Sequence, residues 1–161
     1  MACAAMDDMA DRYASRGVTS VFIYTREAHP GEHYRHHSSI ELKRRHARSF
    51  RDACNIRRRI LVDDLKGTVH HEVGGLLPNT SWIVARGGLI LYKAAWTDAS
   101  DIEDALAQAL DTLEQRRTQE LRPAYAERLL WRVRDDAGFR AGLERAGPQA
   151  VADFYGEEPG S

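Results

Sequence analysis

Hydrophobic positions along the chain follow two different spacings, which together predict a mixture of helices and strands. Over residues 2–15, apolar side chains recur at spacings of three and four, as in an amphipathic helix. The run VTSVFIYT (18–25) is rich in β-branched and aromatic residues and predicts a buried strand. Ser38 and Glu41 have the spacing of a capping box and predict the start of a second helix. The apolar centre of RRILVDD (58–64) then predicts a second strand.

The second half of the chain has one strong local signal. In the segment TSWIVARGGLILYKAAW (80–96), two β-rich runs flank Gly87-Gly88, a dipeptide suited to a two-residue hairpin turn that needs positive φ. Ser100 and Glu103 predict the start of a further helix. Its apolar stripe comprises Ile102, Leu106, Ala109, Leu110 and Leu113. Residues 114–161 are highly charged and predict short helices separated by Pro123 and by Gly147-Pro148.

This order of elements predicts an α/β fold. Strands separated by helices pair in parallel, and a hairpin followed by a helix completes the thioredoxin-like pattern. We therefore expect a thioredoxin-like domain with a mixed central sheet over 1–116 and a helical extension over 117–161. The pattern lacks the central strand that should precede the first helix. Three explanations are open: a true start upstream of Met1, which we favour, a strand supplied by the partner in a homodimer, or a repacked sheet.

Composition narrows the class of protein. The chain has 161 residues, 43% of them hydrophobic and 29% charged, with a net charge of −1. Such a chain has no overall attraction to nucleic acid or to acidic membranes. It contains no apolar run of roughly 20 residues and no signal-peptide core, and its two cysteines cannot form a disulfide framework. We expect a cytoplasmic protein. The basic stretch 35–59 lacks interleaved aromatic residues and predicts a solvated helix face rather than a nucleic-acid site.

A resemblance to a known family appears in YTREAHPGEHY (24–34) and HSSIELK (37–43), which look like the iodothyronine deiodinase family and its bacterial relatives. Tyr24, Glu27, Ala28 and His29 match the motif at the strand end, and Arg26 departs from it. The resemblance extends over about residues 1–113. It implies a thioredoxin-like oxidoreductase that performs reductive dehalogenation or thiol-dependent reduction of a small molecule. An external thiol would be the reductant, without a bound cofactor.

The resemblance also implies roles for individual residues. His29 and His37 would donate protons, and Glu27 would orient His29. Tyr24 and Pro78 would contact substrate, Pro78 being placed where thioredoxin-like folds carry a cis proline. The reactive selenocysteine or cysteine of the family falls, by spacing, before Met1.

The cysteines of the chain allow more than one interpretation. Cys3, near the first helix, is an alternative nucleophile whose pKa a helix N-terminus would lower, or else a small packing residue. Cys54 is a core residue or a resolving thiol.

Other functions also remain open. His29, His33, His36 and His37 suggest a metal site, but without an i, i+4 helical pair they fix no geometry, and we predict none. A peroxiredoxin-like thiol peroxidase or reductase shares the expected fold. A non-catalytic thioredoxin-like binding module is the remaining alternative.

Overall fold

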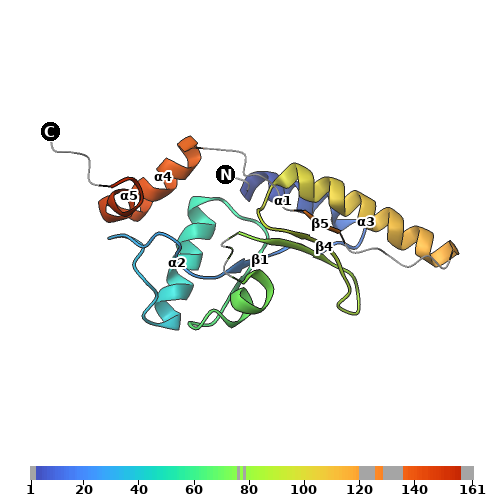
Figure 1. Cartoon of the computed structure of the whole chain (residues 1–161), viewed down its shortest axis with the longest axis horizontal. Coiled ribbons are helices and arrows are strands. Elements are labelled where there is room, and N and C mark those ends of the chain that lie inside the picture. Colours follow the sequence, from blue (N-terminus) through green and yellow to red (C-terminus); the bar gives the residue numbers. More distant parts are fainter. Residues whose placement is uncertain (1–2, 76, 78, 120–125, 129–135, 157–161) are drawn as a thin grey trace.

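The computed structural model describes residues 3–75, 77, 79–119, 126–128 and 136–156. Within these residues the protein is a mixed α/β structure of helices and two small sheets (Figure 1). Its elements are α1 (Cys3–Ala14), β1 (Val21–Tyr24), α2 (Ile40–Ala53), β2 (Arg59–Val62), the π-helix η1 (His70–Gly74), β3 (Ser81–Val84), β4 (Ile90–Ala94), α3 (Ala99–Gln119), β5 (Ala126–Arg128), α4 (Asp136–Ala146) and α5 (Pro148–Tyr155). None of the described helices has the length and apolar character needed to cross a bilayer.

The strands form two sheets rather than one. β1 and β2 pair in parallel, in the register Val21↔Arg59 to Tyr24↔Val62, and α2 connects them. In the second sheet β4 pairs antiparallel with β3 and parallel with β5. The predicted α/β class and the parallel pairing are confirmed. The expected single mixed sheet is not formed among the described residues, because no described strand pairs with both the two-stranded and the three-stranded sheet.

Helix α2 is specified by a local cap. The Ser39 hydroxyl oxygen accepts the backbone N–H of Leu42 at 3.1 Å, so the cap is one residue later than the predicted Ser38. The buried face of the helix carries Lys43, His46 and Ala47, at helical spacing. Phe50 on this helix packs against Phe22 of β1 with ring centroids 5.4 Å apart. This packing fixes α2 beside the two parallel strands.

The main hydrophobic core lies between α1, α3 and β4. Its buried residues are Met6, Met9, Tyr92, Ala94, Ile102 and Leu106. In Figure 1, α1 and α3 lie together along one side of the β3–β5 sheet. At the start of α3, the Asp98 carboxylate accepts the backbone N–H groups of Ser100 and Asp101, so Asp98 supplies the cap that was predicted for Ser100. This helix continues across the predicted boundary at 116/117.

The predicted hairpin is confirmed, with a longer connection than expected. Gly87 and Gly88 both have φ of 85°, which a residue with a Cβ adopts only at a cost. The last ladder pair is Val84↔Ile90, and the Ala85 N–H bonds to the Leu89 carbonyl at 2.8 Å. The turn therefore spans 85–89 rather than two residues.

The helices of the C-terminal region contact the loop that follows β1. Helices α4 and α5 pack through Leu143, Ala146 and Ala150. Gln149 lies in the first turn of α5. Its backbone N–H donates to both carboxylate oxygens of Glu32, at 3.0 Å to Oε1 and 3.1 Å to Oε2. These helices therefore anchor the loop that follows β1. α4 and α5 are two of the short helices predicted for 114–161 and are separated at Gly147, and β5 in the same stretch is an additional strand of the second sheet.

Candidate functional site

Polar side chains gather beyond the carboxyl ends of the two parallel strands. The loop between β1 and α2 carries Glu27 and His37, and α2 carries His46 on its buried face. Ligands of α/β proteins commonly bind at this end of a parallel sheet. The position of these groups therefore follows from the β1–α2–β2 topology.

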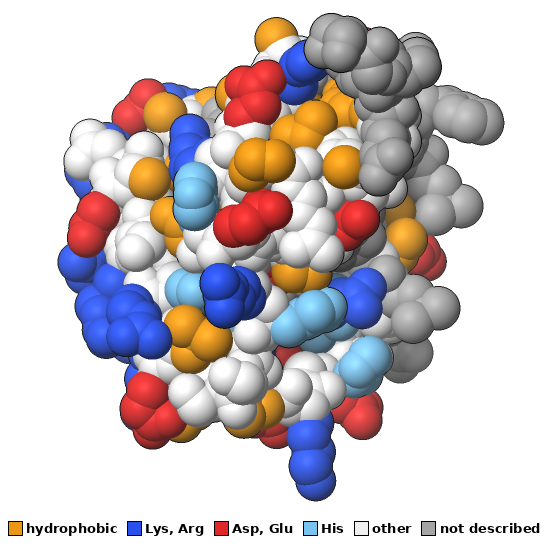
Figure 2. All heavy atoms as spheres, turned by 90° about the vertical axis from the view of Figure 1, so that its left-hand side faces the viewer, with side chains coloured by type: hydrophobic (Ala, Val, Ile, Leu, Met, Phe, Trp, Pro, Cys, Tyr) orange, Lys and Arg blue, Asp and Glu red, His pale blue; other side chains and the backbone are white. Residues whose placement is uncertain are grey.

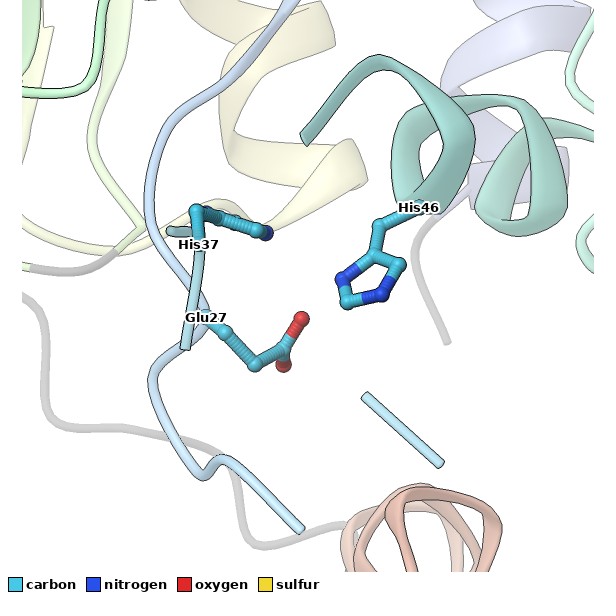
Figure 3. Close-up of side chains that lie close together, drawn as sticks. All are labelled: Glu27, His37 and His46. Atoms are coloured by element: carbon cyan, nitrogen blue, oxygen red, sulfur yellow. The ribbon is translucent and has the colours of Figure 1, made fainter. Parts of the chain in front are cut away.

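Glu27, His37 and His46, here called the His–Glu cluster, converge on one small space. Each contributes one atom, a carboxylate oxygen or a ring nitrogen, and these atoms all lie within 4.8 Å of one another. Figure 3 shows the Glu27 carboxylate and the two imidazole rings directed toward one another from the loop and from α2. Residues distant in the chain thus form a compact group of proton-binding and metal-binding atoms.

Tyr24, the last residue of β1, supports this cluster. Its hydroxyl donates a hydrogen bond of 3.0 Å to Glu27 Oε2. Its ring lies 5.8 Å from the His37 ring and 5.9 Å from the Phe50 ring, measured between centroids. The side chain is 9% exposed. A buried strand residue therefore fixes the orientation of the Glu27 carboxylate.

Burial shifts the protonation of the cluster toward neutral forms. Burial, and next the neighbouring His46, lower the pKa of His37 to about 4. Burial also lowers the pKa of His46, with a further contribution from Arg45. The pKa of Glu27 is raised by burial, although the Tyr24 hydrogen bond and His36 act in the opposite direction. Both imidazoles are therefore neutral at pH 7, and each has one ring nitrogen with a free lone pair.

Two nitrogens of the cluster have no hydrogen-bond partner among the described residues. They are His37 Nε2 and His46 Nδ1, both buried. Buried polar atoms in native proteins are nearly always satisfied, and leaving one unpaired costs about 1–3 kcal/mol. The His–Glu cluster is therefore arranged to interact with something beyond its own side chains.

A cavity of about 530 Å³ adjoins the cluster at His46. Its lining includes three arginines, Arg35, Arg45 and Arg145, and one carboxylate, Glu32, together with His46. This volume is in the range of small-molecule sites. Within the described residues neither Arg45 nor Arg145 pairs with a carboxylate. The cavity can therefore attract an anionic ligand.

Basic side chains lie among acidic and apolar ones on one face of the molecule. Figure 2 shows the face on the left-hand side of Figure 1, where Lys and Arg side chains and histidines lie among Asp, Glu and hydrophobic side chains.

Sequence reasoning and structure agree on part of the site. Of the predicted residues, the structure brings together Tyr24, Glu27 and His37. His29 lies elsewhere: its ring packs edge-on against Phe139 and Phe154 of the C-terminal helices, at 5.5 and 5.4 Å between centroids. Glu27 was expected to orient His29, but its carboxylate accepts a hydrogen bond from Tyr24. Pro78 lies outside the described residues.

Cys3 lies at the opposite end of α2 from His37. Burial and the neighbouring Cys54 raise the pKa of the Cys3 thiol to about 11, whereas a helix N-terminus was expected to lower it. Cys54 caps the C-terminus of α2, and His37 precedes the N-terminus of that 14-residue helix, which spans about 21 Å. The Cys3 thiol is thus neither activated nor near the His–Glu cluster.

His46 was not identified from the sequence. Its position is three residues after Lys43 and four before Phe50, on the face that α2 buries. A polar residue at a buried helical position is a signal that could have been used.

Comparison with protein-family models, curated protein sequences and solved structures finds no match for this chain.

Proposed function

We propose that this chain is a deiodinase-like oxidoreductase domain, in which Tyr24, Glu27 and His37 assist the thiol-dependent reduction of a small anionic substrate. The observation that carries the proposal is the Tyr24–Glu27 hydrogen bond beside the His37 ring. These are three of the residues to which the resemblance gives functional roles. Their convergence in space supports a shared role in one site.

A thioredoxin-like fold is part of the same proposal. The parallel β1–α2–β2 unit, followed by the β3–β4 hairpin and α3, is the element order of such a domain. A strand placed between β1 and β3 would join the two sheets into one mixed sheet. The elements on either side of that position support this assignment.

The proposed chemistry needs a proton at the site and a thiol as reductant. For an iodinated phenol, an external thiolate attacks iodine, the carbon–iodine bond breaks, and the ring carbon takes up a proton. A second thiol then displaces iodide from sulfur and forms a disulfide, so that two thiols are oxidised as the carbon–halogen bond is reduced. Glu27 suits the proton donor because burial raises its pKa. His37 would orient the ring hydroxyl through its buried Nε2.

The cavity suggests the class of substrate. Arg35, Arg45 and Arg145 line it together with His46, one of the three residues of the cluster. Arginine binds carboxylate and phosphate groups through paired hydrogen bonds. A halogenated phenol or an oxidised sulfur compound that carries a carboxylate is therefore the substrate that we favour.

A binding module is the second candidate, and the placement of the thiols favours it. Neither Cys3 nor Cys54 lies in the His–Glu cluster, and the Cys3 thiol has a raised pKa. Under this alternative the cavity binds an anionic ligand without turnover. A peroxiredoxin-like peroxidase has less support, because it needs an activated cysteine at the site.

The test is iodide release from an iodinated phenol that carries a carboxylate, with dithiothreitol as reductant. We expect release above the rate of dithiothreitol alone, and a loss of about 10²–10⁴-fold in both Glu27→Gln and His37→Gln. Arg44→Gln, an exposed change on α2, is the matched control and should retain the rate. Saturable binding of the phenol without iodide release would identify the binding module. Iodide release equal to the dithiothreitol background, with a folded protein, would exclude the oxidoreductase.

A further inference from the structure

We propose that Glu27, His37 and His46 form a binding site for a divalent transition-metal ion, with Zn²⁺ as the ion to test first. The inference goes beyond the proposed function and does not depend on it. It rests on the arrangement of three side chains and on their unsatisfied atoms. Of the residues that the structure describes, no other group of His, Cys, Asp and Glu offers three such atoms in one place.

The donor set is one that metalloproteins use. Two imidazole nitrogens and one carboxylate oxygen bind catalytic zinc and non-haem iron, leaving further positions open. The three atoms lie within 4.8 Å of one another, whereas ligands of a tetrahedral zinc ion lie about 3.3 Å apart. The three donor atoms therefore lie near one another but farther apart than the ligands of a bound zinc ion. Binding of an ion would require the three donor atoms to move closer together.

The unsatisfied nitrogens point independently to a ligand. His46 is 6% exposed, and its Nδ1 is buried without a partner. His37 Nε2 is in the same state. A hydrogen bond between the two rings would have satisfied at least one of these atoms, but none is formed. A metal ion coordinated by both nitrogens would satisfy them together.

Surrounding contacts hold the donors in place. The Tyr24 hydroxyl orients Glu27, in the way that outer hydrogen bonds orient metal-binding carboxylates. The Tyr34 ring packs edge-on against His46 at 5.2 Å between centroids. Two cations lie near the donors: Lys43, whose ammonium group donates to the Asp64 carbonyl at 2.7 Å, and Arg45, whose charge acts on His46. The donors are thus held in place, and the Glu27 carboxylate is the ligand that would offset the positive charge of the ion and of these neighbours.

Other histidines of the chain are less suited to this role. His33 and His36 are exposed, and His29 packs between aromatic rings. His70 Nε2 is also buried without a partner, but the three-residue group does not include it. His46 lines the cavity, so this side of the cluster is adjacent to a space that opens to solvent. The proposal therefore departs from the sequence-based expectation of no metal, because that expectation left out His46.

The experiment is calorimetric titration of the metal-free full chain with Zn²⁺ alone. We expect one ion per chain, and at least about 100-fold weaker binding in Glu27→Gln and in His46→Phe, each of which removes one ligand. His36→Gln, which removes an exposed histidine of the same loop, should bind as the wild type does. Co²⁺ substitution adds a spectroscopic readout, because a site of low coordination number gives intense visible absorption bands.

Several outcomes would overturn the metal site. One is the absence of Zn²⁺ binding by the folded wild type. Others are unchanged binding in both Glu27→Gln and His46→Phe, or loss of binding in His36→Gln. Because Glu27→Gln lies on the loop, it remains informative even where the buried His46 change fails to fold. Iodide release without zinc binding would reject the metal site alone, and zinc binding without iodide release would reject the oxidoreductase alone.

Discussion

The hydroxyl of Tyr24 donates a 3.0 Å hydrogen bond to Glu27 Oε2, joining the last residue of β1 to the loop that follows it. This bond connects the two proposals, because Glu27 is a proton donor in one and a metal ligand in the other. A buried tyrosine hydroxyl needs a partner. The bond therefore stabilises the strand end and fixes the carboxylate at the same time.

Tyr24→Phe tests that connection directly. The change keeps the ring against His37 and Phe50 but removes the donor. We expect Zn²⁺ binding to weaken by about 10–100-fold, as for other hydrogen bonds that orient a ligand. Titration of the metal-free variant measures the effect. An affinity equal to that of the wild type would show that Tyr24 does not orient Glu27 for the metal.

The parts of this structure that the sequence predicts are those with local causes. α2 follows from a serine cap, and the hairpin follows from Gly87-Gly88, which adopts positive φ. The caps themselves shift by one or two positions, to Ser39 and Asp98, because neighbouring polar side chains compete for the same N–H groups. Such competition is decided by geometry that a residue pattern does not contain.

Non-local features were less predictable. The pairing of β5 with β4 and the division into two sheets depend on long-range contacts. His29 was assigned to the site, but α4 and α5 supply Phe139 and Phe154, which bind its ring in another place. Glu27 and His37 lie in one region, because the loop from β1 returns His37 to the Tyr24 ring before α2 begins. His46 joins that region from α2, and this contact depends on how the helix packs on the strands rather than on a local residue pattern.

The unsatisfied Nδ1 of His46 leads to a stability prediction. In His46→Phe, removal of a buried unpaired atom recovers about 1–3 kcal/mol, and the larger ring costs a similar amount. We therefore expect the free energy of unfolding of the metal-free variant to lie within about 1 kcal/mol of the wild type. Zn²⁺ at 100 times its Kd should raise the Tm of the wild type by about 5–10 °C and leave the variant unchanged.

Thermal unfolding with and without Zn²⁺ measures both effects, and His36→Gln serves as the control that keeps the shift. An equal rise of Tm in His46→Phe and in the wild type would place the bound ion at another site.

The thiol of Cys3 should react slowly in the folded protein. Its pKa of about 11 leaves very little thiolate at neutral pH, and the greater nucleophilicity of a more basic thiolate offsets only part of that loss. We expect alkylation by iodoacetamide at pH 7.5 to be roughly 30-fold slower than in the urea-unfolded chain. The rate should rise with pH through the alkaline range. Mass spectrometry of the Cys3 peptide gives the rate. Equal rates in the folded and unfolded chains would restore Cys3 as a candidate nucleophile.

The ion pair between Asp7 and Arg58 predicts a stability that depends on pH. Asp7 is 1% exposed and accepts the backbone N–H of Arg57 at 2.8 Å as well as the Arg58 guanidinium. Burial alone would raise the pKa of Asp7, but these hydrogen bonds and the Arg58 charge lower it below its ordinary value. The unfolded chain therefore binds a proton at higher pH than the folded protein does. The stability that the pair supplies is present above about pH 4 and is lost as pH falls through the folded pKa.

Asp7→Asn should lower the free energy of unfolding by about 3 kcal/mol at pH 7, because it leaves the buried Arg58 charge unpaired. The difference from the wild type should shrink as the pH falls below about 4, where Asp7 of the wild type also becomes neutral. Urea unfolding between pH 7 and pH 2.5 measures this convergence. Asp11→Asn is the matched control: its side chain is 67% exposed in the pair with Arg57, so its effect should stay within about 1 kcal/mol. A gap between Asp7→Asn and the wild type that is constant with pH would show that packing, rather than charge, accounts for the effect of Asp7.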